Sequence, residues 1–242
     1  MIGEREAGVQ REKGGFWIAF CAVFFYPTGW LFGRSRFEGL ENIPARGGAL
    51  VVANHLSHLD PVFTGLIVHR ARRVPRFLAK HSLWGVPVLG QALRGTGQIP
   101  VYRDSVDAQR SLREGERALA DGKVVVIYPE GTISRDPDQW PMHSRTGVAR
   151  LALTADVPVL PVVHWGTREV YDGYNKKFRP LPRKPITVRF GPPIDMSAYR
   201  GRPIDAALLR EVTDMLMTHV RDLLAEVRGE QAPTEFYRRS AS

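Results

Sequence analysis

Short apolar runs alternate with helix-patterned segments from residue 49 onward, and this alternation restricts the chain to a small group of folds. Six runs have the length and composition of strands: residues 49–53, 76–79, 99–102, 124–128, 157–163 and 186–190. Five segments read as helices: residues 60–68, 83–93, 106–120, 147–154 and 206–227. Continuous apolar strands separated by helices are typical of a sheet buried on both faces. We therefore predict an α/β fold with a mostly parallel central sheet flanked by helices.

An apolar, aromatic-rich run at residues 16–32 precedes the alternating region. It is short for a bilayer crossing, which takes about 20 apolar residues. Trp17 and Trp30 belong to the aromatic residues that are enriched at membrane interfaces. The run can be a core helix that covers the domain, or a helix that dips into the lipid headgroup region. We favour the second interpretation, an N-terminal membrane-associating helical segment.

The chain shows no internal repeat and no linker, so we divide it by composition alone. We expect a membrane-associating segment at 1–35, one large domain at 36–230 and a tail at 231–242. A single cysteine, Cys21, excludes an internal disulfide and a thiolate-cluster zinc site, and it fits a reducing compartment.

The charge balance points to anionic partners. The chain has 34 Lys and Arg against 25 Asp and Glu, a formal net charge of +9. Nucleic acid, phosphorylated metabolites and an anionic membrane surface all fit such a charge. The aromatic residues gather in the N-terminal run instead of alternating with basic residues on an exposed surface, which argues against nucleic acid. We therefore expect no nucleic-acid partner.

Polar clusters follow three of the predicted strands. Residues 54–60 follow the first strand, residues 97–103 lead through the third strand to Arg103, and residues 129–135 follow the fourth. Ligands in open α/β sheets bind outside the carboxyl ends of the strands. We expect the three clusters to form one site.

His55 and Asp60 are the candidate catalytic pair. A carboxylate that holds one ring nitrogen fixes the tautomer and leaves the other nitrogen as a base. The chain has no Gly-x-Ser-x-Gly motif, so a substrate hydroxyl would take the place of an enzymatic serine. The implied reaction is direct acyl transfer from an activated donor, such as a thioester, to an alcohol.

Simpler roles are open for the same residues. Asp60 stands before Pro61 and fits an ordinary helix cap, which is compatible with orienting His55. Glu130 can satisfy backbone amides in a turn, and Arg103 can be a solvated strand end. The spacing of His58 to His55 and Asp60 is not a recognised zinc pattern, so we expect no metal.

The clusters together resemble the ordered sequence blocks of a known family, the glycerolipid acyltransferases, and most of all bacterial 1-acylglycerol-3-phosphate acyltransferases. Four blocks carry the resemblance: Asn54-His55 with Asp60, Gly97 with Arg103, Glu130-Gly131-Thr132, and residues 157–161. The segment around Lys80 also matches, and the likeness covers roughly residues 36–195. The third block departs from the family pattern, because Ile133 stands where an arginine is usual. Arg135 and Arg145 are the two candidates for that charge.

The resemblance implies a reaction and roles for the residues. His55 would act as the general base on the sn-2 hydroxyl of lysophosphatidic acid (1-acylglycerol 3-phosphate), and Asp60 would orient it. The product would be phosphatidic acid. Acyl-CoA would be a co-substrate, and no cofactor would be needed. The substrate-binding residues would be Lys80, Arg103, Glu130, Gly131, Thr132 and Arg135.

The resemblance also implies partners and a location, with alternatives left open. The partners would be acyl-CoA, lysophosphatidic acid and an anionic membrane surface, and the location the cytoplasmic face of the cell membrane. Glycerol 3-phosphate or a glycolipid remains open as the acceptor, and acyl carrier protein as the donor. A non-enzymatic basic protein that binds lipid or nucleic acid is the distant alternative.

Overall fold

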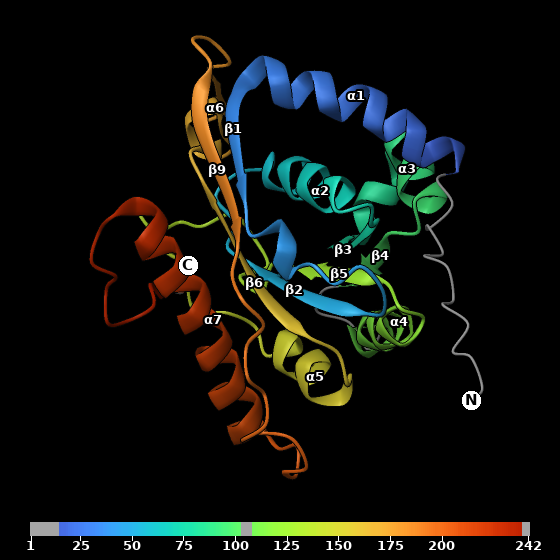
Figure 1. Ribbon diagram of the computed structural model, residues 1–242, viewed down its shortest axis with the longest axis vertical. Coiled ribbons are helices and arrows are strands. Elements are labelled where there is room, and N and C mark those ends of the chain that lie inside the picture. Colours follow the sequence, from blue (N-terminus) through green and yellow to red (C-terminus); the bar gives the residue numbers. More distant parts are fainter. Residues whose placement is uncertain (1–14, 103–107, 239–242) are drawn as a thin grey trace, which may run out of the picture.

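A seven-stranded sheet forms the centre of the computed structural model, which describes residues 15–102 and 108–238 (Figure 1). Its strands are β1 (Gly33–Glu38), β2 (Ala49–Ala53), β3 (Pro75–Lys80), β4 (Ile99–Val101), β5 (Val124–Ile127), β6 (Val159–Trp165) and β9 (Lys184–Phe190). The order across the sheet is β1-β9-β6-β2-β5-β3-β4. Neighbouring strands run parallel except β6 and β9, so the predicted mostly parallel α/β fold is confirmed. The carboxyl ends of β2 to β6 consequently share one edge.

Helices cover both faces of the sheet (Figure 1). They are α1 (Phe16–Phe32), α2 (Asp60–Arg70), α3 (Leu89–Gly95), α4 (Ala108–Ala120), α5 (Gly147–Thr154), α6 (Thr167–Val170) and α7 (Ala206–Arg228). Two 3₁₀ turns, η1 (Leu40–Asn42) and η2 (His81–Gly85), and a small pair of strands, β7 (Tyr171–Asp172) and β8 (Lys177–Phe178), complete the elements. Among the described residues, no helix combines the length and the apolar character that a membrane crossing requires.

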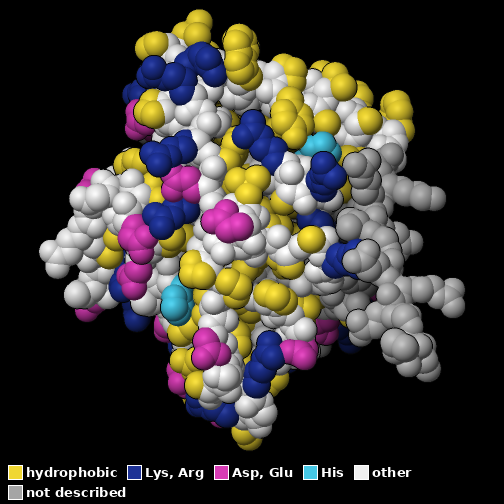
Figure 2. Space-filling view, in the orientation of Figure 1, with side chains coloured by type: hydrophobic (Ala, Val, Ile, Leu, Met, Phe, Trp, Pro, Cys, Tyr) yellow, Lys and Arg dark blue, Asp and Glu magenta, His cyan; other side chains and the backbone are white. Residues whose placement is uncertain are grey.

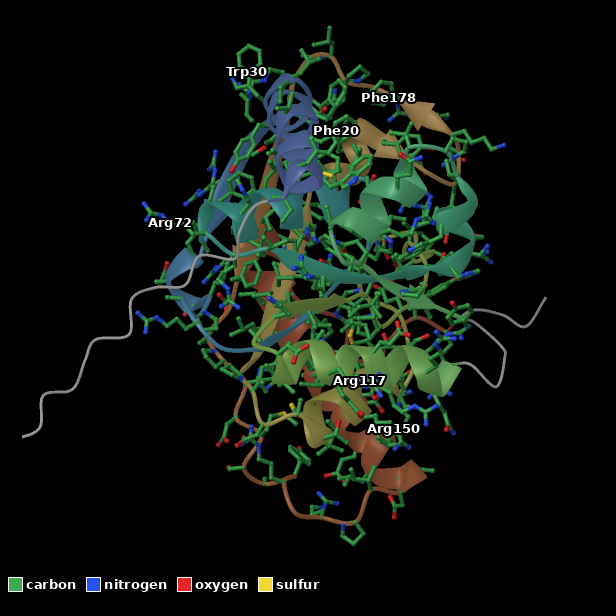
Figure 3. All side chains as sticks on the ribbon, turned by 90° about the vertical axis from the view of Figure 1, so that its right-hand side faces the viewer. Phe20, Trp30, Arg72, Arg117, Arg150 and Phe178 are labelled. Atoms are coloured by element: carbon green, nitrogen blue, oxygen red, sulfur yellow. The ribbon has the colours of Figure 1, made fainter. Side chains whose placement is uncertain are left out.

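Helix α1 packs on the domain with one face and is exposed on the other. Gly29 meets α2 so closely that a Cβ there would lie 2.5 Å from a methyl carbon of Leu66. Phe16, Val23 and Trp30 are 74%, 69% and 69% exposed. Figure 2 shows apolar side chains gathered along this upper edge of the molecule, and Figure 3 shows Phe20 and Trp30 at the same end. The helix therefore covers the core and also presents apolar side chains outward.

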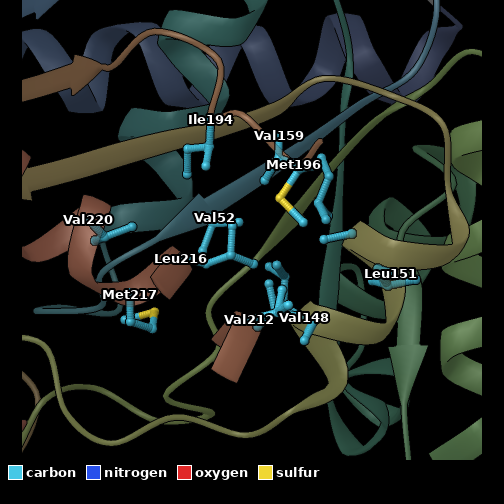
Figure 4. Close-up of a cluster of buried hydrophobic side chains, with 14 of the residues drawn as sticks. Val52, Val148, Leu151, Val159, Ile194, Met196, Val212, Leu216, Met217 and Val220 are labelled. Atoms are coloured by element: carbon cyan, nitrogen blue, oxygen red, sulfur yellow. The ribbon is translucent and has the colours of Figure 1, made fainter. Parts of the chain in front are cut away.

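The side chains of β2 divide the core into two clusters, one on each face of the sheet. Leu50 and Val52 face α5 and α7, where Leu151 and Leu216 are fully buried (Figure 4). The alternate residues of β2 face α2 on the other side. This burial on both faces explains why β2 reads as an uninterrupted apolar run.

Two elements differ from the sequence-based expectation. Residues 33–38 form the edge strand β1, which the sequence does not predict, because two arginines and a glutamate interrupt its apolar residues. An edge strand needs no apolar run on both faces. The helix predicted at 83–93 is divided into η2 and α3 around Pro87, whose ring is incompatible with a helix interior. The predicted segments 1–35 and 231–242 lie partly outside the described residues, and that domain division stays a prediction.

Candidate active site

His55 and Asp60 form a hydrogen-bonded pair at the carboxyl end of β2. The Nδ1 atom of His55 lies 2.9 Å from Oδ2 of Asp60. The chain turns from β2 into α2 between them, which brings the two side chains together across four intervening residues. The His55 side chain is 13% exposed and that of Asp60 is fully buried. Because Nδ1 faces the carboxylate, Nε2 lies on the opposite side of the ring, where a base must meet its substrate.

The Asp60 carboxylate has three further donors. Oδ2 accepts hydrogen bonds from the backbone N–H groups of Leu56 and Ser57, and Oδ1 accepts one of 2.5 Å from the Thr167 hydroxyl. Burial alone would raise the pKa of Asp60, but His164, His55 and Thr167 outweigh it and lower the pKa below its ordinary value. Asp60 is therefore an anion that holds His55 in place.

The alternative role of Asp60 as an ordinary helix cap is wrong. Its carboxylate accepts from Leu56 and Ser57, which precede α2, and among the described residues no side chain caps this helix. The first turn of α2 needs no side-chain cap, because Pro61 has no N–H and the Val62 and Phe63 amides donate to the Leu59 carbonyl.

The His55 ring also stacks on Tyr128, with ring centroids 4.3 Å apart. Burial raises the pKa of Tyr128 well above its ordinary value, so its hydroxyl stays neutral. That hydroxyl lies 3.1 Å from the hydroxyl of Thr64, which lies 2.7 Å from Nε2 of the fully buried His164. A chain of hydrogen-bonded polar groups therefore runs from the Tyr128 ring, on which His55 stacks, to the buried His164.

Sequence reasoning missed Thr167 and Tyr128. Thr167 follows β6, which ends at the same edge as β2, so its position after a parallel strand was an available signal. Tyr128 stands directly after β5, beside the Glu130 turn, whereas the apolar run predicts it as the last residue of the strand.

Glu130 is buried, and its carboxylate accepts hydrogen bonds from two backbone amides. Oε1 accepts a 2.9 Å hydrogen bond from the His55 N–H, and Oε2 accepts one of 3.0 Å from the Met142 N–H. This geometry matches the simpler interpretation, a side chain that satisfies a turn. Burial raises the pKa of Glu130 to about 8, although the two N–H donors oppose that shift. Glu130 thus fixes the backbone at His55, and its contact with substrate stays a prediction.

We predict that the free energy of unfolding of the wild type, relative to that of Glu130→Gln, falls as pH rises. The folded chain keeps this carboxyl protonated up to about pH 8, whereas in the unfolded chain it ionises near 4.5. Unfolding then releases a proton, so the free energy of unfolding falls across that range. Glutamine does not titrate. Thermal unfolding followed by circular dichroism should show the difference between the two midpoints falling by roughly 10 °C between pH 5 and pH 8.5. The same change of unfolding midpoint with pH in the two proteins would contradict a raised pKa of Glu130.

The turn after Glu130 brings the other third-block residues to the same edge. Gly131 has a φ of +70°, and a Cβ there would lie 3.4 Å from Nε of Arg145. The Thr132 hydroxyl lies 3.4 Å from the Tyr174 hydroxyl, and Nε of Arg135 donates to that same oxygen at 3.3 Å. Both candidate arginines therefore border this turn.

Ile133 occupies the position where an arginine is usual, and its side chain is 3% exposed. The main chain directs this position into the interior, where an ionised guanidinium would be costly to bury. A charge at this part of the site consequently has to come from another position.

Lys80 is exposed at the carboxyl end of β3, opposite Val101 at the end of β4. Arg103 lies outside the described residues. Within residues 15–102 and 108–238, no group of three or more His, Cys, Asp or Glu side chains could hold a metal ion. The expectation of a metal-free site stays a prediction.

Comparisons with known proteins place this site in a family. The family model described as Acyltransferase matches residues 34–165, more than half of the chain. The chain belongs to the acyltransferase family. The matched region contains His55, Asp60 and the Glu130 turn, so the predicted resemblance to glycerolipid acyltransferases is confirmed.

Solved and curated acyltransferases agree with this assignment. The crystal structure of the 1-acyl-sn-glycerophosphate (LPA) acyltransferase PlsC from Thermotoga maritima superposes with a TM-score of 0.62 at 27% identity, covering 86% of this chain and 79% of that one. The 1-acyl-sn-glycerol-3-phosphate acyltransferase of Limnanthes douglasii is 28% identical over 179 residues, which are 73% of this chain and 60% of the plant protein.

An uncharacterised protein of Mycobacterium tuberculosis is 28% identical over 238 residues, covering 83% of this chain. The match spans 63% of that relative's length. The chain therefore corresponds to somewhat less than two thirds of the curated relatives it matches.

Proposed function

We propose that this chain transfers a fatty acyl group from acyl-CoA to the sn-2 hydroxyl of 1-acylglycerol 3-phosphate, which yields phosphatidic acid. The observation that carries the proposal is the His55–Asp60 pair, held by buried donors at the strand edge where α/β sheets bind ligands. The named Thermotoga and Limnanthes relatives support the choice of acceptor.

In the proposed reaction, His55 and Asp60 act as a general-base pair. Nε2 of His55 removes the proton of the acceptor hydroxyl while Nδ1 donates to Asp60. The hydroxyl oxygen forms a bond to the thioester carbonyl carbon, the carbon–sulfur bond breaks, and the departing thiolate takes the proton from His55. The anionic Asp60 stabilises the imidazolium that forms in between. General-base help of this kind contributes about 10²- to 10⁴-fold in rate.

The acceptor phosphate would be bound by cations around the same edge. Lys80 at the end of β3 and Arg103 after β4 are assigned to it, and Arg135 borders the Thr132 turn. An arginine offers a planar pair of donors that fits two phosphate oxygens, whereas a lysine acts as a point charge. Gly131 keeps the turn open, because any side chain at its positive φ would be strained and would face Arg145.

The same proposal includes a location at the cytoplasmic face of the membrane. Helix α1 packs against α2, and its exposed apolar face would lie in the headgroup region. The net charge of +9 favours an anionic lipid surface. Lysophosphatidate, the proposed acceptor, is itself a membrane lipid.

An acceptor panel tests this function. Purified protein is given palmitoyl-CoA with lysophosphatidate, glycerol 3-phosphate or a glycolipid, and free thiol is measured. We expect release of coenzyme A with lysophosphatidate at least tenfold above the other acceptors. Equal or greater release with glycerol 3-phosphate or the glycolipid would assign the chain to another acceptor.

A further inference from the structure

The chain between α6 and β9 forms a short hairpin. Strands β7 and β8 pair antiparallel, with Tyr171 opposite Phe178 and Asp172 opposite Lys177. The stretch is polar and basic, and its sequence has no periodic pattern that predicts a pair of strands. We refer to residues 171–183 as the β7–β8 hairpin.

Three contacts join the β7–β8 hairpin to the end of α1. The Phe178 ring meets Phe32 edge-on with centroids 5.2 Å apart, and the Arg183 guanidinium lies 4.8 Å from the ring centre of Trp30. Arg183 also donates a 2.7 Å hydrogen bond to the Gly33 carbonyl. Two segments about 150 residues apart therefore form one continuous surface.

This surface is apolar and exposed. Phe178 is 53% exposed and Leu181 68%, next to the largely exposed Trp30. Figure 3 shows Phe178 at the same end of the molecule as Phe20 and Trp30, while Arg117 and Arg150 lie toward the opposite end. Solvent-exposed aromatic and aliphatic side chains that cluster in this way mark an interaction surface.

Basic side chains border the same surface. Residues 168–184 contain six Lys or Arg and two Asp or Glu, and Lys176, Lys177 and Arg179 are exposed on the hairpin. Figure 2 shows Lys and Arg side chains beside apolar ones at this end of the molecule. Long basic side chains can bury their stems in apolar surroundings while their charges reach phosphate groups.

We infer that the β7–β8 hairpin is a second membrane-contacting element, whose partner is an anionic phospholipid bilayer. Phe178 and Leu181 enter the boundary between headgroups and acyl chains, and Lys176, Lys177 and Arg179 bind the lipid phosphates. The inference deepens the proposed membrane location, because it assigns part of the lipid contact to a segment far from α1 in sequence.

The hairpin also contacts the catalytic loops. The Ser57 hydroxyl donates a 2.7 Å hydrogen bond to the Tyr171 carbonyl, and the Tyr174 hydroxyl donates one of 2.5 Å to the Ile133 carbonyl. Ser57 itself donates its backbone N–H to Asp60. A bilayer held by the hairpin would therefore lie next to the loops that carry the catalytic pair, which suits an acceptor delivered from the membrane.

Vesicle sedimentation tests the inference without any substrate. The vesicles contain phosphatidylcholine with 30% phosphatidylglycerol, and the variants are Leu181→Ser and the triple change Lys176→Glu, Lys177→Glu and Arg179→Glu. Basic residues near an anionic surface each add to the attraction, so reversing three should weaken binding at least ~10-fold. Arg117→Glu with Arg150→Glu is a charge-reversal control at the opposite end, with two charges reversed, and should bind like the wild type.

A single label gives a second measurement. The chain has one cysteine, so Cys21→Ser with Phe178→Cys permits an environment-sensitive fluorophore at the hairpin alone, and Cys21→Ser with Arg150→Cys supplies the control. We expect a blue shift on vesicle addition for position 178 only. The inference would be overturned if the hairpin variants bound vesicles within twofold of wild type, or if the control lost as much binding. The absence of a fluorescence shift at position 178 would also overturn it.

The vesicle experiments can fail without the acylation assay failing, and the reverse is also true. If the hairpin variants bind vesicles normally while the wild type forms phosphatidate, the inference fails and the function stands. If binding depends on the hairpin but no acceptor is acylated, the function fails and the inference stands.

Discussion

The His55→Ala variant should lose acyl transfer by about 10²- to 10⁴-fold, because it removes the proposed general base for the acceptor hydroxyl. The loss should fall on kcat, since the histidine acts on the reacting hydroxyl and the phosphate contacts are retained. The measurement is coenzyme A release from palmitoyl-CoA in the presence of lysophosphatidate, together with circular dichroism to show that the variant is folded.

Folding should survive this change. The contact between Glu130 and residue 55 uses the backbone N–H, which alanine retains. His58→Ala is the matched control, because His58 is an exposed histidine in the same loop, and it should keep most of the wild-type activity. Near wild-type turnover by His55→Ala, or an equal loss in His58→Ala, would refute the assigned role of His55.

The Asp60→Asn variant should lose a comparable 10²- to 10⁴-fold in kcat with its backbone geometry largely retained. The amide oxygen can still accept from Leu56, Ser57 and His55, and the amide nitrogen can donate to the Thr167 hydroxyl. The negative charge is removed, so the imidazolium formed during proton transfer is no longer stabilised. The variant therefore separates the charge of Asp60 from its hydrogen bonds.

Thr167→Val serves as the matched control for this charge. It removes one donor to Asp60 and keeps the carboxylate, so the loss in kcat should be about 10-fold or less, and Thr167→Ser should restore activity. The expected order of kcat is wild type and Thr167→Ser, then Thr167→Val, then Asp60→Asn. An Asp60→Asn enzyme within tenfold of wild type would contradict the role of the charge.

The fold and the proximity of His55 to Asp60 were predictable because local patterns and topology agree. Buried parallel strands need apolar residues on both faces, so β2 and β5 were evident from composition. The polar residues that directly follow them had to meet at one edge. The pairing of His55 with Asp60 follows from this geometry and a short loop.

Features that depend on tertiary contacts were not predictable in the same way. Thr167 reaches Asp60 across 107 positions of the chain, and its place after β6 indicates the edge of the sheet but not the contact with Asp60. The edge strand β1 lacks the apolar pattern of a buried strand. The Glu130 carboxylate accepts from the Met142 amide, 12 residues further along the chain, and no local pattern indicates that contact.

The most direct test of the account is the product formed by the wild type from palmitoyl-CoA and 1-oleoyl lysophosphatidate, identified by mass spectrometry with His55→Ala as the blank. The account predicts one molecule of 1-oleoyl-2-palmitoyl phosphatidate for each coenzyme A released, and almost none from the variant. Release of coenzyme A with free palmitate and no phosphatidate, or equal phosphatidate from His55→Ala, would contradict it.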